Sequence, residues 1–219
     1  MQSNWMKMLA LSGLFLFSLQ CFSKTGITFS LNWGNIGFQC SDNQLEETID
    51  EIEKQREQKF NENREKGFYD VSIPFPSLPS WARCQEIALK TRPEIVLVRM
   101  HLAASKVAMA LMSQRGHDPF DDSLTEGLPF RFDPEDWGRY LAQRALARAH
   151  SKEGAKRIIS HLQEKFRMLF SDVRDRINRD VVWAHHELGR LPATSRSMER
   201  NRAMWKLLFA MGFPESVRP

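Results

Sequence analysis

The residues with the most chemistry to offer lie near the C-terminal end of a predicted helix, where Asp180 precedes His185-His186-Glu187. Imidazole and carboxylate groups together can hold a metal ion. Adjacent residues on a helix project about 100° apart, so His185 and His186 cannot both ligate one ion simply. The sequence has no H-E-x-x-H motif and no cysteine pair at zinc spacing. We therefore expect a polar helix surface here and no metal site.

A second group of candidate ligands, His117, Asp118, Asp121 and Asp122, lies in a segment interrupted by glycine and proline. The ligand spacing of an EF-hand is missing, so these side chains are better suited to turns and caps. The sequence also lacks a P-loop, a G-x-S-x-G motif and a dinucleotide fingerprint. We expect no catalytic residues, no cofactor and no enzymatic activity.

Basic residues form a more informative pattern in the C-terminal part of the chain. Residues 131–219 hold 18 Lys and Arg against 11 Asp and Glu, whereas the first 130 residues hold 13 against 16. This asymmetry is typical of a polyanionic partner or of Arg-rich solvated helix faces. The candidate contacts to nucleic acid are Arg139, Arg144, Arg148, Lys152, Lys156, Arg174 and Arg179.

Four of these residues recur at every fourth position between Arg144 and Lys156, which builds a basic ridge if one helix continues that far. Gly154 would turn the ridge if it breaks the helix. Trp137, Tyr140 and Trp183 could offer stacking faces, and a basic groove with aromatic platforms is the arrangement that holds single-stranded nucleic acid. The alternative is that these aromatic side chains belong to the core and the arginines face water.

The elements that carry these residues belong to a chain of 219 residues, which has room for one domain of roughly 120–200 residues. Hydrophobic residues make up 42% and charged residues 26%, which are ordinary values for a globular protein. This composition argues against wholesale disorder and against a polytopic membrane protein.

The N-terminus contains an uncharged, mostly apolar run at residues 8–22, after Lys7. It resembles a secretory signal, and it is short for a membrane-spanning helix, which needs about 20 residues. The alternative is an arm that packs on a neighbouring subunit or in the core. Cleavage would leave Cys40 and Cys84, which could form a disulfide in an exported chain and would be free and buried in a cytosolic one.

Residues 24–80 are predicted to form an N-terminal extension. Alternating apolar residues on both sides of Gly34-Asn35 predict a short β-hairpin, and residues 42–66 predict a polar helix that frays after Phe60. Pro74, Pro76 and Pro79 then predict an extended connector. We place the domain boundary near Ser80, which gives segments 1–23, 24–80 and 81–219.

Helical patterns dominate after residue 80. We expect helices over 81–92, 94–113, from Pro134 onward, over about 158–170 and 173–188, and over 197–211. The segment 94–113 is the most apolar, and Arg99, His101 and Lys106 argue against a membrane span because a charge at mid-bilayer costs at least about 2.5 kcal/mol. The fold class that follows is all-α: a helical core with an N-terminal extension that contains the hairpin and the Pro-rich connector.

Short stretches of residues 81–213 resemble coat proteins of flexuous filamentous plant RNA viruses. The similar stretches are Lys106-Val107-Ala108, Asp118-Pro119, Val181-Val182-Trp183 and Leu191-Pro192-Ala193. The resemblance implies that arginines on the C-terminal helices line an RNA groove, and by position it implicates Arg174 and Arg202. It also implies an N-terminal arm that reaches a neighbouring subunit. The family's Phe-rich segment is reduced here to Trp205 and Phe209, and a signal-like N-terminus is not expected in it.

Two functions are therefore expected from the sequence. The first is a structural, self-assembling protein of the coat or nucleocapsid type, which binds single-stranded RNA and copies of itself and is located in a virion. The alternative is an exported helical interaction protein, secreted or periplasmic, with a Cys40–Cys84 disulfide and a membrane surface or a protein as its partner.

Overall fold

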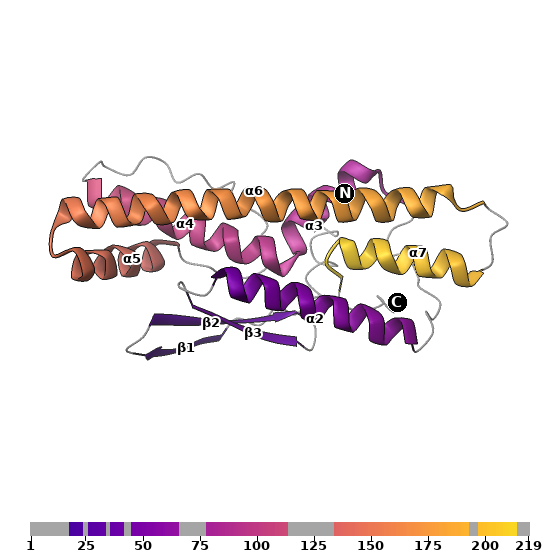
Figure 1. Ribbon diagram of the computed structural model, residues 1–219, viewed down its shortest axis with the longest axis horizontal. Helices are drawn as coiled ribbons and strands as arrows, with labels where there is room; N and C mark the ends of the chain where they lie inside the picture. The colour runs from indigo at the N-terminus through magenta and orange to yellow at the C-terminus, as the bar shows by residue number, and fades with distance from the viewer. Residues whose placement is uncertain are drawn as a thin grey trace, which may run out of the picture. The chain divides into compact units, whose positions relative to one another are not determined.

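The helices of this chain begin and end where local chemistry requires. The computed structural model describes residues 18–23, 26–33, 36–41, 45–65, 78–113, 134–192 and 197–213, with the three strands described by their backbone alone. From residue 45 on, these residues form six helices, which confirms the all-α class for this part of the chain (Figure 1). The Pro-rich connector is predicted for a segment that lies almost entirely outside the described residues.

The backbone of the three N-terminal strands forms one antiparallel sheet. The strands are β1 (Ser18–Ser23), β2 (Gly26–Trp33) and β3 (Ile36–Ser41), in the order β1-β2-β3. Trp33 pairs with Ile36, and the register continues to Thr28 opposite Ser41. These two strands use the residues for which the sequence predicts a hairpin.

The helices α2 (Leu45–Glu65), α3 (Trp81–Thr91) and α4 (Pro93–Ser113) follow. Ser80 begins α3, because its side-chain oxygen accepts a hydrogen bond from the backbone N–H of Arg83 (3.3 Å). Arg92 is extended, as expected for a residue before proline, and Pro93 starts α4 at the first helical position. The predicted start of this helix at residue 94 is therefore correct to within one residue.

The remaining helices are α5 (Pro134–Ala149), α6 (Lys152–Arg190) and α7 (Ser197–Ala210). The sequence predicts two helices over 158–188, and this is wrong: α6 is one helix of 39 residues. Its buried side chains at Phe166, Val173 and Ile177 are spaced by seven and four residues, which one helical stripe accommodates without a break.

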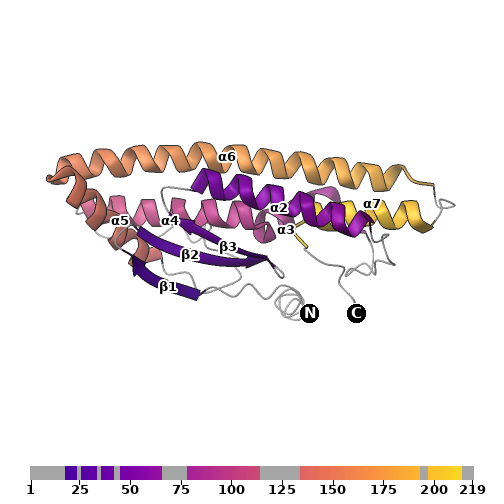
Figure 2. The ribbon, with the colours of Figure 1, turned by 60° about the horizontal axis from the view of Figure 1, so that its bottom comes forward.

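The chain divides into two compact units that differ from the predicted division at residue 80. One unit contains Met1–Glu94 and Arg174–Pro219, and the other contains Ile95–Val173. In the first unit, Figures 1 and 2 show α2 and α7 beside the C-terminal part of α6. Ion pairs join these elements: Arg176 of α6 binds Glu53 of α2 (2.7 Å), and Lys206 of α7 binds Glu187 of α6 (2.6 Å).

The second unit packs α4, α5 and the N-terminal part of α6 around His101. This fully buried ring lies edge-on to Trp137 (5.7 Å between centroids) and to Phe166 (5.5 Å), and its Nδ1 donates to the carbonyl of Leu97 (2.8 Å). Trp137 is 4% exposed, which confirms the alternative in which this aromatic side chain belongs to the core.

Among the described residues, α4 is the one helix that is long and apolar enough to cross a membrane. Its apolar window is 78% buried inside the protein. Helices at the centre of a soluble core pass the same test of length and composition.

Candidate functional site

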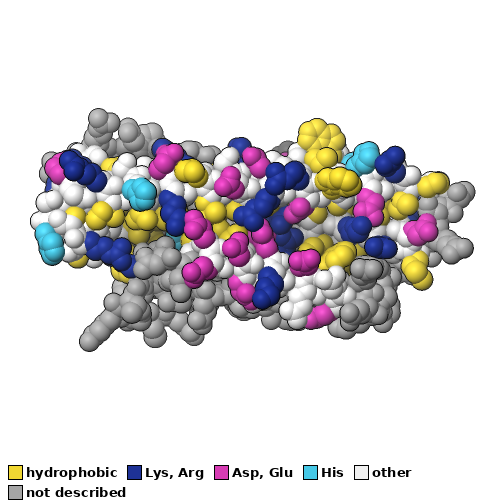
Figure 3. All heavy atoms as spheres, viewed as in Figure 1, with side chains coloured by type: hydrophobic (Ala, Val, Ile, Leu, Met, Phe, Trp, Pro, Cys, Tyr) yellow, Lys and Arg dark blue, Asp and Glu magenta, His cyan; other side chains and the backbone are white. Residues whose placement is uncertain are grey.

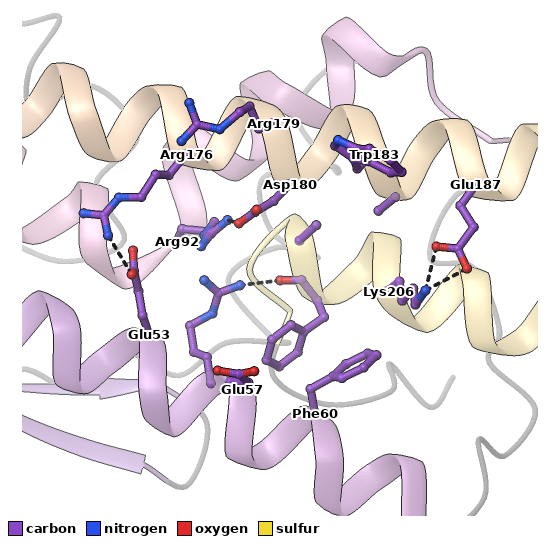
Figure 4. Close-up of a pocket in the computed structure, with 14 residues that line it drawn as sticks. Glu53, Glu57, Phe60, Arg92, Arg176, Arg179, Asp180, Trp183, Glu187 and Lys206 are labelled. Atoms are coloured by element: carbon purple, nitrogen blue, oxygen red, sulfur yellow. Dashed lines mark hydrogen bonds and ion pairs between the residues drawn. The ribbon is translucent and has the colours of Figure 1, made fainter.

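A cavity of about 690 Å³ opens in the first unit, between α2, the C-terminal part of α6, and α7 (Figure 4). Nine charged and five apolar side chains line it. They are Glu53, Arg56, Glu57 and Phe60 from α2, Arg92, then Arg176, Arg179, Asp180, Trp183, Ala184 and Glu187 from α6, and Lys206, Phe209 and Ala210 from α7.

Two buried arginines form one wall of this cavity and share a single buried carboxylate. Arg56 and Arg92 both bind Oε1 of Glu94, the latter through Nη2 at 2.7 Å and Nε at 3.1 Å. Burial alone would raise the pKa of Glu94, but the two guanidinium groups outweigh it and lower this pKa to about 2. Arg92 also reaches the half-exposed Asp180 (2.6 Å). The cluster therefore keeps its charges fixed at neutral pH.

The same cluster holds the C-terminus of α7. Arg56 Nη2 donates to the carbonyl of Phe209 (2.6 Å), and the hydroxyl of Thr91 donates to the carbonyl of Met211. Gly212, at φ +94°, lets the chain turn back so that the N–H of Phe213 reaches the carbonyl of Leu208 (3.0 Å). A cation at a helix C-terminus also suits the helix dipole, so one guanidinium positions both α7 and the cavity wall.

The charged groups at the rim are mostly neutralised within the site. Arg176 binds Glu53 (2.7 Å), and Lys206 contacts both carboxylate oxygens of Glu187 (2.7 and 2.6 Å). Within the described residues, no ion pair engages Arg179 or Glu57. These two side chains are therefore the charges available to a ligand.

Trp183 is the most exposed large apolar side chain of the described residues, at 75% exposure. It lies one helical turn after Arg179 and one turn before Glu187, and Figure 4 shows all three on the α6 side of the cavity. A guanidinium, an indole and a carboxylate thus follow one another at four-residue spacing, which places them on one face of the helix. Such a row offers an anion contact, a stacking surface and a hydrogen-bond acceptor in order.

The structure also places the predicted cations of the second unit. Arg139 is bound by Glu135 (3.0 Å) and Asp136 (3.6 Å), and Lys156 by Glu153 (2.9 Å). Arg148 and Lys152 are exposed, and no ion pair within the described residues involves them, while Arg144 is half-buried. Of the five, the two residues next to the α5–α6 junction are the most accessible to a polyanion.

Of the two alternatives for residues 144–156, one continuous helix or a break, the structure has the break. The helix ends at Ala149, His150 adopts a positive φ of 53°, and a new helix begins at Lys152. Ser151 accounts for the restart, because its hydroxyl oxygen accepts a hydrogen bond from the N–H of Gly154 (3.1 Å). The break therefore precedes the glycine, and two helices share the four cations.

In the first unit, the three predicted cations differ in their surroundings. Arg179 lines the cavity, Arg174 is exposed beside Asp175 (3.3 Å), and Arg202 is exposed on α7. In the view of Figure 3, acidic side chains gather over α2 and Lys and Arg side chains are interspersed with them. This face of the protein therefore carries mixed charge and is not uniformly basic.

The polar groups near His185 do not form a metal site. His185 Nε2 donates to the carbonyl of Pro79 (3.0 Å), which ties α6 to the residues before α3. Among the described residues, no group of three His, Cys, Asp or Glu side chains is placed to hold a metal ion. The acidic segment at 117–122 lies outside the described residues.

Cys84 is a free, buried thiol in this structure, and the Cys40–Cys84 disulfide of the exported alternative stays a prediction. Its Sγ contacts the carbonyl of Pro79 (3.8 Å), and burial raises the pKa of the thiol. The side chain of Cys40 is outside the description, because β3 is described by its backbone alone. Burial of Cys84 explains why a reduced thiol is stable at this position.

The sequence reasoning missed the buried arginines and Lys206. A signal for Arg56 exists, because it lies four residues after Ile52 on the only apolar stripe of α2. A charged residue at such a position must have a buried partner. Lys206 had no comparable signal, because its role depends on the packing of α7 against α6.

No family model, curated protein or solved structure matches this chain. The row on α6 supplies the chemistry of the site, with Arg179 and Trp183 as its accessible members.

Proposed function

We propose that this chain is a structural RNA-binding protein of the coat or nucleocapsid type, which self-associates and is located in a virion. The observation that carries the proposal is the exposed indole of Trp183 at the edge of the cavity, one helical turn from Arg179, which no ion pair engages within the part of the chain that the structure describes. Single-stranded nucleic acid is bound by this combination, since bases stack on aromatic rings and phosphates bind nearby cations.

Exposed cations outside the cavity would bind RNA phosphates independently of the base sequence. Arg148 and Lys152 near the α5–α6 junction, Arg174 on α6 and Arg202 on α7 are all exposed. Each phosphate that such a side chain neutralises releases counterions, which favours binding at low salt. In this proposal each of them binds phosphate, while Trp183 and Arg179 hold one nucleotide.

Self-association would make these modest contacts cumulative along an RNA. The N-terminal extension, with its predicted hairpin and Pro-rich connector, is the arm that reaches the neighbouring copy. Linked binding sites raise the overall affinity by the effective concentration of the next site, so each protomer needs few contacts of its own. A chain that lacks residues 1–41 should bind RNA more weakly and sediment as a smaller species.

The test is the affinity of the full-length chain for a fluorescently labelled single-stranded RNA, measured by anisotropy over a range of salt. If five cations contact phosphates, log K should fall with log salt at a slope of about −3.5, which is roughly 100-fold between about 50 and 200 mM. Removing one contact with Arg179→Gln should reduce the magnitude of the slope by about 0.7.

Arg83→Gln is the matched control, because Arg83 is an exposed arginine of the same unit that is bound to Glu86 on α3, away from the cavity. It makes the same change in charge, so its slope should equal that of the unmodified chain. Binding that is absent, or that does not respond to salt, would exclude the proposal.

A further inference from the structure

The carboxylates of the cavity offer hydrogen-bond acceptors, which neither the phosphate-binding cations nor a stacking ring provides. Glu187 lies one turn beyond Trp183 on α6, and Glu57 faces the same cavity from α2. A base that stacks on Trp183 would present its edge to acceptor groups. An ionised carboxylate only accepts hydrogen bonds, at about four lone-pair positions.

Some hydrogen-bond acceptors of the cavity are left over by its ion pairs. Lys206 has three N–H groups and directs two of them at the oxygens of Glu187. Arg176 is bound to Glu53, and Arg92 is bound to Glu94 and Asp180. The carboxylate of Glu57 is not engaged by any hydrogen bond or ion pair within the described residues. Glu57 and Glu187 therefore keep unused acceptor positions near Trp183, while the unused donors belong mainly to Arg179.

We propose that this cavity is a base-selective nucleotide subsite that favours bases with an exocyclic amine over uracil. In it, Trp183 stacks on the base, Arg179 binds an adjacent phosphate, and Glu187 accepts hydrogen bonds from the amine. The inference rests on the proposed RNA binding and deepens it, because it specifies which bases one position of the strand carries.

Uracil is disfavoured by its own edge. Cytosine carries an N4 amine and adenine an N6 amine, both of which donate to a carboxylate. Uracil offers a single donor, N3–H, with a carbonyl oxygen on each side, so it can give Glu187 one hydrogen bond but places the lone pairs of O4 where cytosine places its amine. A good base-edge contact of this kind discriminates against the wrong base by a factor of about five or more.

Lys206 is a positioning residue in this subsite. Its ammonium group contacts both oxygens of Glu187, and it approaches from α7. The carboxylate is therefore fixed against α6, with lone pairs left for a ligand. Fixed acceptors select a base more strongly than mobile ones, because less ordering is required on binding.

The experiment compares short oligocytidylate and oligouridylate, which differ at C4 of the ring, as labelled ligands of the full-length chain at neutral pH and low salt. We expect oligocytidylate to bind about five-fold or more tightly. Glu187→Gln should bring the ratio of the two affinities close to one, because an amide can donate to uracil O4 and accept from cytosine N4. The ratio is insensitive to the general change in charge, which affects both ligands equally.

Two controls separate the subsite from structural effects. Glu164→Gln makes the same change at an exposed position of α6 that is bound to Arg167 (3.5 Å), and it should preserve the preference. Trp183→Ala should weaken oligocytidylate by about 5- to 150-fold, while Trp81→Ala, at an indole that is 54% exposed outside the cavity, should leave it unchanged. Circular dichroism would verify that each variant is folded.

The outcomes distinguish the two proposals. Equal, salt-dependent affinity for both oligonucleotides, unaffected by Trp183→Ala, overturns the subsite and leaves RNA binding standing. A preference that survives Glu187→Gln overturns the role of the carboxylate. Failure to bind either oligonucleotide at low salt overturns the proposed function and the subsite with it.

Discussion

Replacing Glu94 by Gln should destabilise the protein strongly, because this fully buried carboxylate neutralises two buried arginines. The variant leaves Arg56 and Arg92 close together without their shared counter-charge. Removing one partner of a buried ion pair typically costs about 3–5 kcal/mol. The free energy of unfolding at neutral pH should fall by that amount, which is a large part of the ordinary stability of a domain, about 5–15 kcal/mol.

The pKa of Glu94 gives an independent magnitude. In the folded chain it is lowered from 4.5 to about 2. A lowered pKa means that the folded state favours the ionised carboxylate. The stabilisation is therefore complete above about pH 4.5 and is lost as the pH falls toward 2. At about 1.4 kcal/mol for each pH unit, the shift corresponds to roughly 3 kcal/mol, in agreement with the cost of breaking the pair.

Urea denaturation of the two proteins between neutral pH and about pH 3 would measure both effects. The difference between the original chain and Glu94→Gln should be largest at neutral pH and should shrink as the pH falls below about 4.5, since protonation then removes the same charge. Glu86→Gln is the control, because Glu86 is an exposed carboxylate that binds Arg83 and Lys90, and its loss should cost less than about 1 kcal/mol. If Glu94→Gln were as stable as Glu86→Gln at neutral pH, the reasoning would be refuted.

Three further substitutions and one chemical modification test the packing. Gly138→Ala should lower the free energy of unfolding by about 1–3 kcal/mol in thermal or urea unfolding, because the new Cβ would overlap Val107 Cγ1. Gly189→Ala is the matched control, because its Cβ meets nothing within 4 Å, and it should stabilise the helix by up to about 1 kcal/mol. Gly212→Ala should destabilise the chain by about 1 kcal/mol or more in the same assay, since a side chain is strained at φ +94°. Cys84 should be alkylated slowly in the native protein and rapidly in urea, as read by peptide mass, because it is buried with a raised thiol pKa; fast native alkylation would contradict its burial.

Helix positions were largely predictable, because they follow from local signals. Pro93 and Pro134 mark two helix starts, and both appear at the first helical position. The end of α6 near Gly189 was also predictable from the glycine and the proline that follows it. The helix break expected between residues 170 and 173 does not exist, because α6 is continuous there. Two successive amphipathic helices whose apolar faces are in phase have the same sequence pattern as one long helix.

The cavity was less accessible to sequence reasoning, because it joins residues far apart in the chain. Arg179 was predicted as a cation and Trp183 as a stacking group, and the structure places both at one cavity. Trp137 belongs to the same residue class as Trp183, yet it is buried against His101. Helical spacing separates these two tryptophans, because Trp137 lies one turn before the buried Leu141, whereas Trp183 lies off the buried stripe of α6.

Ultraviolet cross-linking of a single-stranded RNA to the full-length chain, followed by mass mapping of the linked peptides, tests the central claim most directly. The account predicts cross-links within residues 174–190 of α6, centred on Trp183, that are lost in Trp183→Ala and retained in Trp81→Ala. Cross-links confined to other segments, or none at low salt, would contradict RNA binding at this helix.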